Sequence, residues 1–218
     1  MNPYDPSESL DAATNRWLEH IARFNTHDFA LASASALLVI DMQSFFLDPT
    51  SPTFTVGGIQ IMPRIEMLMR AFRLAGKPVI FTRHVHDGSL NDAGIMGWWW
   101  PGMCVDGTPE SLVHSDLAPL AGEKIINKHR YSAFYNTDLE TVLRVLKIED
   151  LVITGIMTNM CCESTARDAY YRDYRVHFLA DATGSIVEEM HEATLLNLAL
   201  GFARITRTDQ ILKEVANW

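Results

Sequence analysis

The sequence predicts a three-layer α/β/α fold with a six-stranded parallel sheet as its middle layer. Short apolar runs of strand length alternate with longer amphipathic segments along the 218 residues, and strands that alternate with helices form parallel sheets covered on both faces. Charged residues also follow two of the apolar runs: Asp41 comes after residues 36–40, and Lys128 comes after residues 124–127. Because ligand sites in open α/β sheets lie outside the carboxyl ends of the strands, both observations indicate the same architecture.

The chain is expected to begin with a helix that precedes the sheet. Apolar residues recur at helical spacing over residues 9–26, which indicates an amphipathic helix. Residues 1 to about 33 are therefore expected to form a helical extension of one domain that spans residues 1–218. After the first strand, a helix is expected over residues 61–75, and Gly76 marks its end because glycine is common just past a helix.

The other elements alternate regularly up to the C-terminus. Strands are expected at 36–40, 78–82, 124–127, 151–153, 176–180 and 203–206, and further helices at 138–146, 161–172, 187–201 and 209–215. The segment 84–108 is rich in Gly and Trp and is expected to be a long loop.

Bulk properties exclude several classes of protein. The formal net charge of −9 disfavours nucleic acid and anionic membranes as partners. Three cysteines, two of them adjacent, do not form a disulfide framework, which indicates a reducing, cytoplasmic location. The first residues have no basic region followed by an apolar core, and no apolar run is long enough to span a membrane, so neither a secretory signal nor a membrane segment is predicted.

The most informative segment runs from Thr154 to Asp168 and contains Cys161. It follows a predicted strand and leads into a predicted helix, so Cys161 is expected near the first turn of that helix. Free N–H groups and the helix dipole favour an anion there, and thiol pKa values fall at such positions. A buried, inert cysteine, a helix-capping Asp41 and a solvated Lys128 are the simpler interpretations of the three residues. Their shared position at one edge of the sheet favours a nucleophile, a base and a cation instead.

These residues lie in three motifs that resemble the isochorismatase-like cysteine hydrolases. The motifs are Leu38–Gln43, Lys128–Phe134 and Thr154–Asp168, and the resemblance covers about residues 36–212. It implies the strand order 3-2-1-4-5-6, in which the first and fourth strands flank the switch point. It also implies a catalytic triad of Asp41, Lys128 and Cys161. The oxyanion hole is expected from the backbone N–H groups of Cys161 and Met157, with a cis peptide between Ile156 and Met157.

Hydrolysis of a C–N bond, in an amide or a carbamoyl or ureido group, is the predicted reaction. The Cys161 thiolate would attack a carbonyl carbon while Asp41 moves the protons and Lys128 favours the thiolate. The alternative is cleavage of a vinyl ether with Asp41 as the acid, because Lys128–Phe134 most resembles true isochorismatases. Those enzymes carry Gly at the nucleophile position, so Cys161 favours C–N cleavage. No glycine-rich turn follows Asp41, which argues against a nucleotide-binding module.

The substrate pocket is expected to include Arg83, Trp98, Tyr131 and Phe134. Whether residues 98–100 form a wall of the active site or a subunit interface is left open.

No cofactor and no metal are predicted. Some relatives hold a metal with an Asp-x-His pattern after the second strand, but this chain has His84 and His86 there without the aspartate. A small-molecule substrate and a homodimer or homotetramer are what the resemblance implies.

Overall fold

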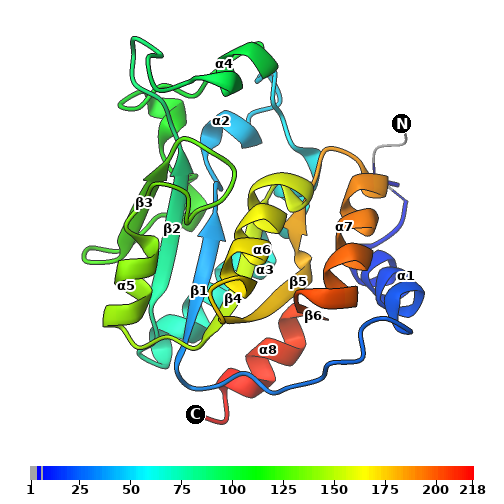
Figure 1. Cartoon of the computed structure of the whole chain (residues 1–218). Coiled ribbons are helices and arrows are strands. Elements are labelled where there is room, and N and C mark those ends of the chain that lie inside the picture. Colours follow the sequence, from blue (N-terminus) through cyan, green and yellow to red (C-terminus); the bar gives the residue numbers. More distant parts are fainter. Residues whose placement is uncertain (1–3, 6) are drawn as a thin grey trace.

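Six parallel strands form the central sheet in the order β3-β2-β1-β4-β5-β6, which confirms the predicted fold class. The computed structural model describes residues 4–5 and 7–218, so residues 1–3 and 6 of the expected N-terminal extension lie outside the described part (Figure 1). The strands are β1 Ser35–Ile40, β2 Val79–His84, β3 Lys124–Lys128, β4 Asp150–Ile156, β5 Arg175–Gly184 and β6 Arg204–Thr206. All carboxyl ends point to the same edge (Figure 1).

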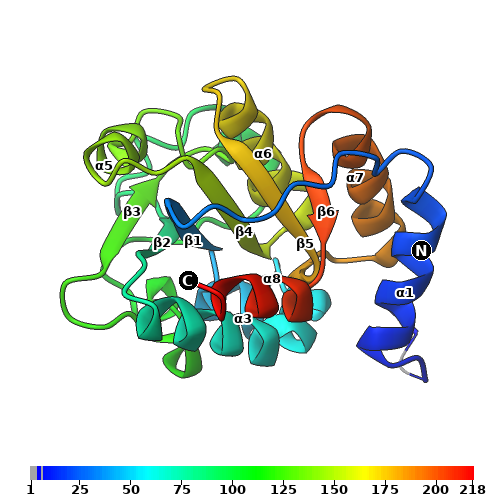
Figure 2. The same cartoon turned by 90° about the horizontal axis from the view of Figure 1, so that it is seen from below.

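Helices cover both faces of the sheet, as Figure 2 shows from below. On one face lie α3 Val56–Leu74 and α8 Thr208–Val215, and on the other lie α5 Leu139–Val145, α6 Glu163–Tyr170 and α7 Glu188–Gly201. Every residue of β1 and β4 is buried, because central strands of such a sheet have packing on both sides. Two hydrophobic clusters, one per face, form the core.

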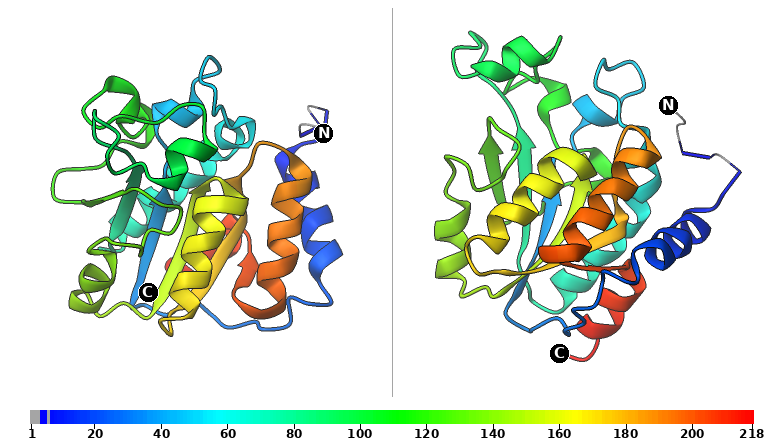
Figure 3. Two further views of the ribbon diagram at one scale, coloured as in Figure 1. Left: turned by 45° about the horizontal axis from the view of Figure 1, so that its top comes forward. Right: turned by 45° about the vertical axis from the view of Figure 1, so that its right-hand side comes forward.

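The N-terminal helix α1, Leu10–Ile21, packs beside α7 at the outer side of the molecule (Figure 3). Ser9 begins it by accepting a hydrogen bond from the backbone N–H of Ala12. Its Trp17 is buried and lies 4.4 Å, centroid to centroid, from the ring of His191 on α7. The helix ends five residues before the predicted position. Among the described residues, no helix has the length and apolar character that a membrane crossing requires.

Other helical segments also differ from the expectation, α3 and two short helices among them. Helix α3 begins at Val56 rather than at residue 61. Its first turn contains Gly57 and Gly58, which are poor helix formers, so the sequence gives little sign of a helix there. A Cβ on Gly57 would lie 2.8 Å from the carbonyl oxygen of Ser185, so glycine is needed there for close packing. The short helices α2, Ser44–Leu47, and α4, Ile95–Trp99, were not predicted, since so few residues show no periodicity.

The sheet is tightest where β1 meets β4. Gly155 has φ +110°, and a Cβ there would lie 2.1 Å from the carbonyl oxygen of Ile40. Only glycine satisfies both requirements. The pairing of β4 with β5 also shifts register between Ile153 and Gly155, which re-aims the end of β4. The chain segments that leave β1 and β4 therefore start very close together.

Candidate active site

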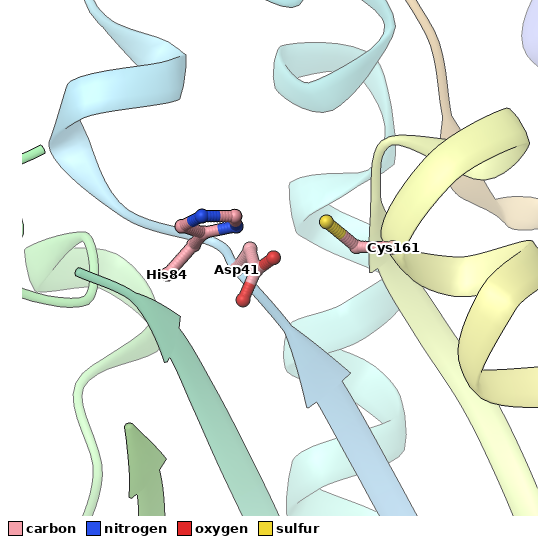
Figure 4. Close-up of side chains that lie close together, drawn as sticks. All are labelled: Asp41, His84 and Cys161. Atoms are coloured by element: carbon pink, nitrogen blue, oxygen red, sulfur yellow. The ribbon is translucent and has the colours of Figure 1, made fainter. Parts of the chain in front are cut away.

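Four side chains from four segments meet beyond the carboxyl ends of the central strands. Asp41 directly follows β1, His84 ends β2, Lys128 ends β3, and Cys161 lies in a π-helical turn, Thr158–Cys162, after β4. Figure 4 shows the Cys161 sulfur pointing toward the Asp41 carboxylate and the His84 ring. The ligand atoms of these three side chains lie within 4.8 Å of one another. The topology thus brings together the three residues predicted as the triad, with His84 as a fourth neighbour.

Lys128 is the centre of this group and is fully buried. Its Nζ lies 2.6 Å from Asp41 Oδ2, 3.3 Å from Cys161 Sγ and 3.3 Å from His84 Nδ1, and it donates to the carbonyl oxygen of Arg130 at 3.1 Å. Burial alone would lower the pKa of the ammonium, but attraction to the Asp41 carboxylate, together with the contact to Cys161, outweighs burial and raises it. Lys128 is therefore a fixed cation between the carboxylate and the sulfur.

Asp41 is held in place by its backbone and by β2. Its φ of 51° lies in the left-handed region, which aspartate tolerates better than most residues. The hydroxyl of Thr82 accepts a hydrogen bond from the Asp41 N–H at 3.1 Å and donates one to Asp41 Oδ1. The other carboxylate oxygen, Oδ2, forms the ion pair with Lys128. Sequence reasoning missed Thr82; its place near the end of β2, beside β1, was the available signal.

The pKa of the Cys161 thiol is shifted in the direction opposite to the expected one. Burial, more than any other factor, raises the pKa of this thiol to about 12; Lys128 lowers it and Asp41 raises it. The expectation that a helix N-terminus lowers the pKa of this thiol is therefore wrong. The α-helical part of α6 begins only at Glu163, so Cys161 precedes it by two residues. A base is needed to remove the proton, and the nearest one is Asp41.

The adjacent cysteine belongs to the core. Cys162 has no exposed surface, and its Sγ lies 4.0 Å from the carbonyl oxygen of Thr154. Burial, the largest factor, raises the pKa of its thiol well above the ordinary value. Of the two neighbours, only Cys161 borders the pocket described next.

The pocket is lined by several sulfur-containing side chains and by many apolar groups. Around Cys161 lie aromatic rings, neutral polar groups and sulfur-containing side chains from five segments of the chain: Phe45, Phe46, Thr53, His84, His86, Met96, Trp100, Gly102, Met103, Cys104, Tyr131 and Met157. The peptide bond between Ile156 and Met157 is cis, and both Met157 and Cys161 line the pocket. No Lys, Arg, Asp or Glu is found among the described residues that line it.

Of the four residues predicted to line the pocket, only Tyr131 does so. Arg83 instead pairs with Asp106 at 3.2 Å and donates to Asn127. Trp98 is three-quarters exposed on α4. Phe134 is buried beneath the site, with its ring stacked 6.0 Å from that of Tyr174. These three predictions are corrected.

Within the Trp98–Trp100 run, the last tryptophan forms the wall of the pocket. Trp100 follows α4 directly and lines the pocket, and its Nε1 donates to the hydroxyl of Tyr131 at 3.0 Å. The two preceding tryptophans are exposed. The helical turn of α4 separates these roles, and the sequence had no signal for that turn.

Among the residues that the structure describes, two groups of side chains have metal-binding residue types. In the first, formed by Asp41, His84 and Cys161, the Lys128 ammonium lies within 3.3 Å of one atom of each. A fixed positive charge at that distance repels a metal cation. This donor set therefore does not fit a metal.

The second group is His86, Asp92 and His129. The ring nitrogens that face Asp92 are already engaged: His86 Nδ1 lies 3.1 Å from Asp92 Oδ1, and His129 Nδ1, which is 3.2 Å from Asp92 Oδ2, lies 2.6 Å from the carbonyl oxygen of Val85. A carbonyl oxygen only accepts, so the His129 nitrogen carries a proton and has no lone pair for a metal.

We therefore expect activity without a metal ion. Dialysis against a chelator should leave turnover unchanged, and elemental analysis of the purified protein should find no stoichiometric zinc or iron. A stoichiometric metal whose removal abolishes turnover would contradict this expectation.

Comparison with known proteins places the chain in a family. The Isochorismatase domain matches residues 35–210. Nicotinamidase 3 of Arabidopsis thaliana is 38% identical over 184 residues, which cover 83% of this chain and 88% of that protein. Ureidoacrylate amidohydrolase RutB of Stutzerimonas stutzeri is 32% identical over 210 residues, covering 85% and 84% of the two chains.

A solved structure agrees with the sequence comparisons. The crystal structure of a cysteine hydrolase from Pseudomonas syringae pv. phaseolicola superposes with a TM-score of 0.84 and 30% identity, covering 87% of this chain and 96% of that one. The chain described here belongs to the isochorismatase-like family of hydrolytic enzymes.

Proposed function

We propose that the chain hydrolyses the C–N bond of a small, uncharged, planar amide through a thioester on Cys161. The observation that carries the proposal is the position of the sulfur. Cys161 Sγ borders the pocket, with the Lys128 ammonium 3.3 Å away and the Asp41 carboxylate within 4.8 Å. A nucleophile, a base and a cation at these distances suit acyl transfer.

In the first half of the reaction, Asp41 accepts the thiol proton as the sulfur attacks the carbonyl carbon. The S–C bond forms, and the carbonyl oxygen takes up the negative charge. Backbone N–H groups at Met157 and Cys161 are the proposed donors to that oxygen. The C–N bond then breaks, and protonated Asp41 returns its proton to the leaving nitrogen.

In the second half, water replaces the amine. Asp41 accepts one proton of the water as its oxygen bonds to the thioester carbon. The C–S bond then breaks, and the proton passes from Asp41 to the sulfur, which regenerates the thiol. The products are ammonia or an amine and a carboxylic acid. Because burial raises the pKa of the thiol, the proposal places proton transfer to Asp41 in the same step as the attack.

The lining of the pocket supports an uncharged substrate. Four aromatic rings, those of Phe45, Phe46, Trp100 and Tyr131, border it. Among the described lining residues none is a cation that could pair with a substrate carboxylate, and burying an unpaired carboxylate is costly. Of the activities in the relatives' names, nicotinamide hydrolysis fits this lining better than hydrolysis of ureidoacrylate, which carries a carboxylate.

A panel of matched amides tests the proposal. We expect ammonia release from nicotinamide and benzamide, and from the methyl ester of maleamate in preference to maleamate itself. The preference within the ester–acid pair should be at least about 100-fold in kcat/KM, since an unpaired buried charge costs several kcal/mol and 1.4 kcal/mol is tenfold. Trp100→Ala should raise KM for the aromatic amides more than it lowers kcat. Equal or faster hydrolysis of maleamate would contradict the proposed substrate class, and no amide hydrolysis at all would contradict the reaction.

A further inference from the structure

A chain of hydrogen bonds leads from the buried Lys128 to the loop before α4. Lys128 Nζ lies 3.3 Å from His84 Nδ1, His84 Nε2 lies 3.2 Å from His86 Nε2, and His86 Nδ1 lies 3.1 Å from Asp92 Oδ1. Both histidine side chains are buried, whereas the Asp92 side chain is about one-quarter exposed. The mechanism above uses Lys128 but none of the other three.

The donor at one end and the acceptor at the other end fix the direction in which each hydrogen bond of this series is donated. An ammonium has only N–H donors, so a proton on His84 Nδ1 would face an N–H group of Lys128; His84 Nδ1 therefore carries no proton. His84 then has its proton on Nε2 and donates to His86 Nε2. His86 in turn has its proton on Nδ1 and donates to Asp92, whose ionised carboxylate only accepts. Both rings are neutral, and each has one defined tautomer.

Burial of the two rings agrees with their neutral state. Burial, and next the charge of Lys128, keeps the pKa of His84 well below its ordinary value. Burial also lowers the pKa of His86, although Asp92 acts in the opposite direction.

Asp92 is fixed at the outer end by three other contacts. Its Oδ2 accepts from the backbone N–H of Asp87 at 3.1 Å and lies 3.2 Å from His129 Nδ1. Arg130 Nη1 donates to its backbone carbonyl at 3.2 Å. Both carboxylate oxygens therefore face donors, and an amide in this place would present an N–H group to one of them.

We propose that Asp92 is a positioning residue for Lys128, acting through His86 and His84 by fixing the tautomers of both rings. The proposal rests on the proposed function, in which Lys128 acts as a fixed cation. Without an acceptor at Asp92, His86 is free to carry its proton on Nε2. That proton would then face the Nε2–H of His84, and two N–H groups repel each other. The His84 proton would therefore move to Nδ1, where it would face the Lys128 ammonium. Lys128 would lose an acceptor and meet a donor in its place.

The test is Asp92→Asn, which keeps size and removes the second acceptor. We expect about a tenfold loss of kcat with little change in KM, because outer partners that orient functional groups contribute about 10- to 100-fold in other sites. The alkaline limb of the kcat/KM profile should move to lower pH, since an ammonium that loses an acceptor gives up its proton more readily. An unshifted limb would contradict the proposal.

Every charged or titratable group near the Lys128 ammonium can affect the position of that alkaline limb. These groups come from four segments packed around the ammonium: Asp41 after β1, His84 and His86 on and after β2, His129 and Arg130 after β3, and Cys161 and Cys162 in the π-helical turn.

Two variants separate positioning from a general effect on the loop. Asp87→Asn removes a carboxylate of the same loop that accepts hydrogen bonds from the backbone N–H and the hydroxyl of Ser89, and it should leave kcat and the pH profile unchanged. His84→Asn keeps an acceptor near Nδ1 but breaks the link to His86. In that background, Asp92→Asn should lower kcat less than twofold, because residues that act through one network are non-additive. A full tenfold loss in both backgrounds would show that Asp92 does not act through His84.

A spectroscopic measurement makes the proposal independent of turnover. Nitrogen-15 NMR of the histidine rings should show His84 protonated at Nε2 and His86 at Nδ1 in the wild type at neutral pH, and a changed tautomer in Asp92→Asn. His84 protonated at Nδ1 in the wild type would overturn the inference even if amide hydrolysis is confirmed. The expected tautomers without any amide hydrolysis would support the chain of hydrogen bonds and contradict the proposed function alone.

Discussion

Cys161→Ala should abolish ammonia release from amides, with a loss of at least about 10⁴-fold in kcat/KM, as when nucleophiles are removed from other covalent hydrolases. The physical reason is that no other described group bordering the pocket combines a sulfur with the Lys128 and Asp41 contacts. The measurement is ammonia release, with circular dichroism to verify the fold.

The adjacent cysteine offers a matched control. Cys162→Ala removes the same atom from a fully buried site, so it should lower the melting temperature slightly and leave turnover near the wild-type value. Near-normal turnover of Cys161→Ala would contradict the thioester mechanism, and vinyl-ether cleavage by Asp41 would then gain support.

Substitutions of Asp41 and Lys128 should shift the titration of Cys161 in opposite directions. Asp41 raises the pKa of the thiol and Lys128 lowers it. Asp41→Asn removes the carboxylate charge, so the thiol pKa should fall and alkylation by iodoacetamide at a fixed pH should become faster. Lys128→Met removes the cation, so the thiol pKa should rise and alkylation should become slower.

Turnover should fall in both variants although their thiol pKa values shift in opposite directions. This contrast would identify Asp41 as the base and Lys128 as the cation that favours the thiolate. Asp41→Asn loses the general base, which contributes about 10²- to 10⁴-fold in enzymes, although its thiol is easier to ionise. The measurement is an alkylation-rate profile against pH beside kcat for each variant. Identical alkylation profiles for the wild type and both variants would show that the charges do not act on the sulfur. Thr82→Val is a useful companion, because it removes the hydroxyl bonded to Asp41 Oδ1 and leaves both charges in place.

The fold and the central residues could be predicted from the sequence because their signals are local and redundant. The apolar runs at β1 and β4 are fully buried strands, and a charged residue at the end of a strand lies at the ligand edge wherever the helices are placed. For Asp41 and Lys128, strand position was therefore sufficient to predict the edge of the sheet at which both lie. Cys161 was placed by the strand and helix around it.

The pocket walls could not be predicted in the same way. Trp98 and Trp100 are two residues apart, and only the unpredicted turn of α4 decides which one borders the pocket. Phe134 and Tyr131 lie in one motif, yet one is buried in the core and the other lines the pocket. The thiol pKa was misjudged for a different reason: the sequence indicates charged neighbours but not the extent of burial, and here burial dominates.

The glycine at the junction of β1 and β4 limits how this enzyme can be redesigned. Any side chain at position 155 would need both a reversed backbone angle and space that the Ile40 carbonyl occupies, so no single substitution there is compatible with the present separation of the two strands. A library that aims at new substrates should hold this position constant and vary Phe45, Met96, Trp100 and Tyr131, which border the pocket without setting the spacing of the reacting groups. Selectivity and reactivity can then be altered separately.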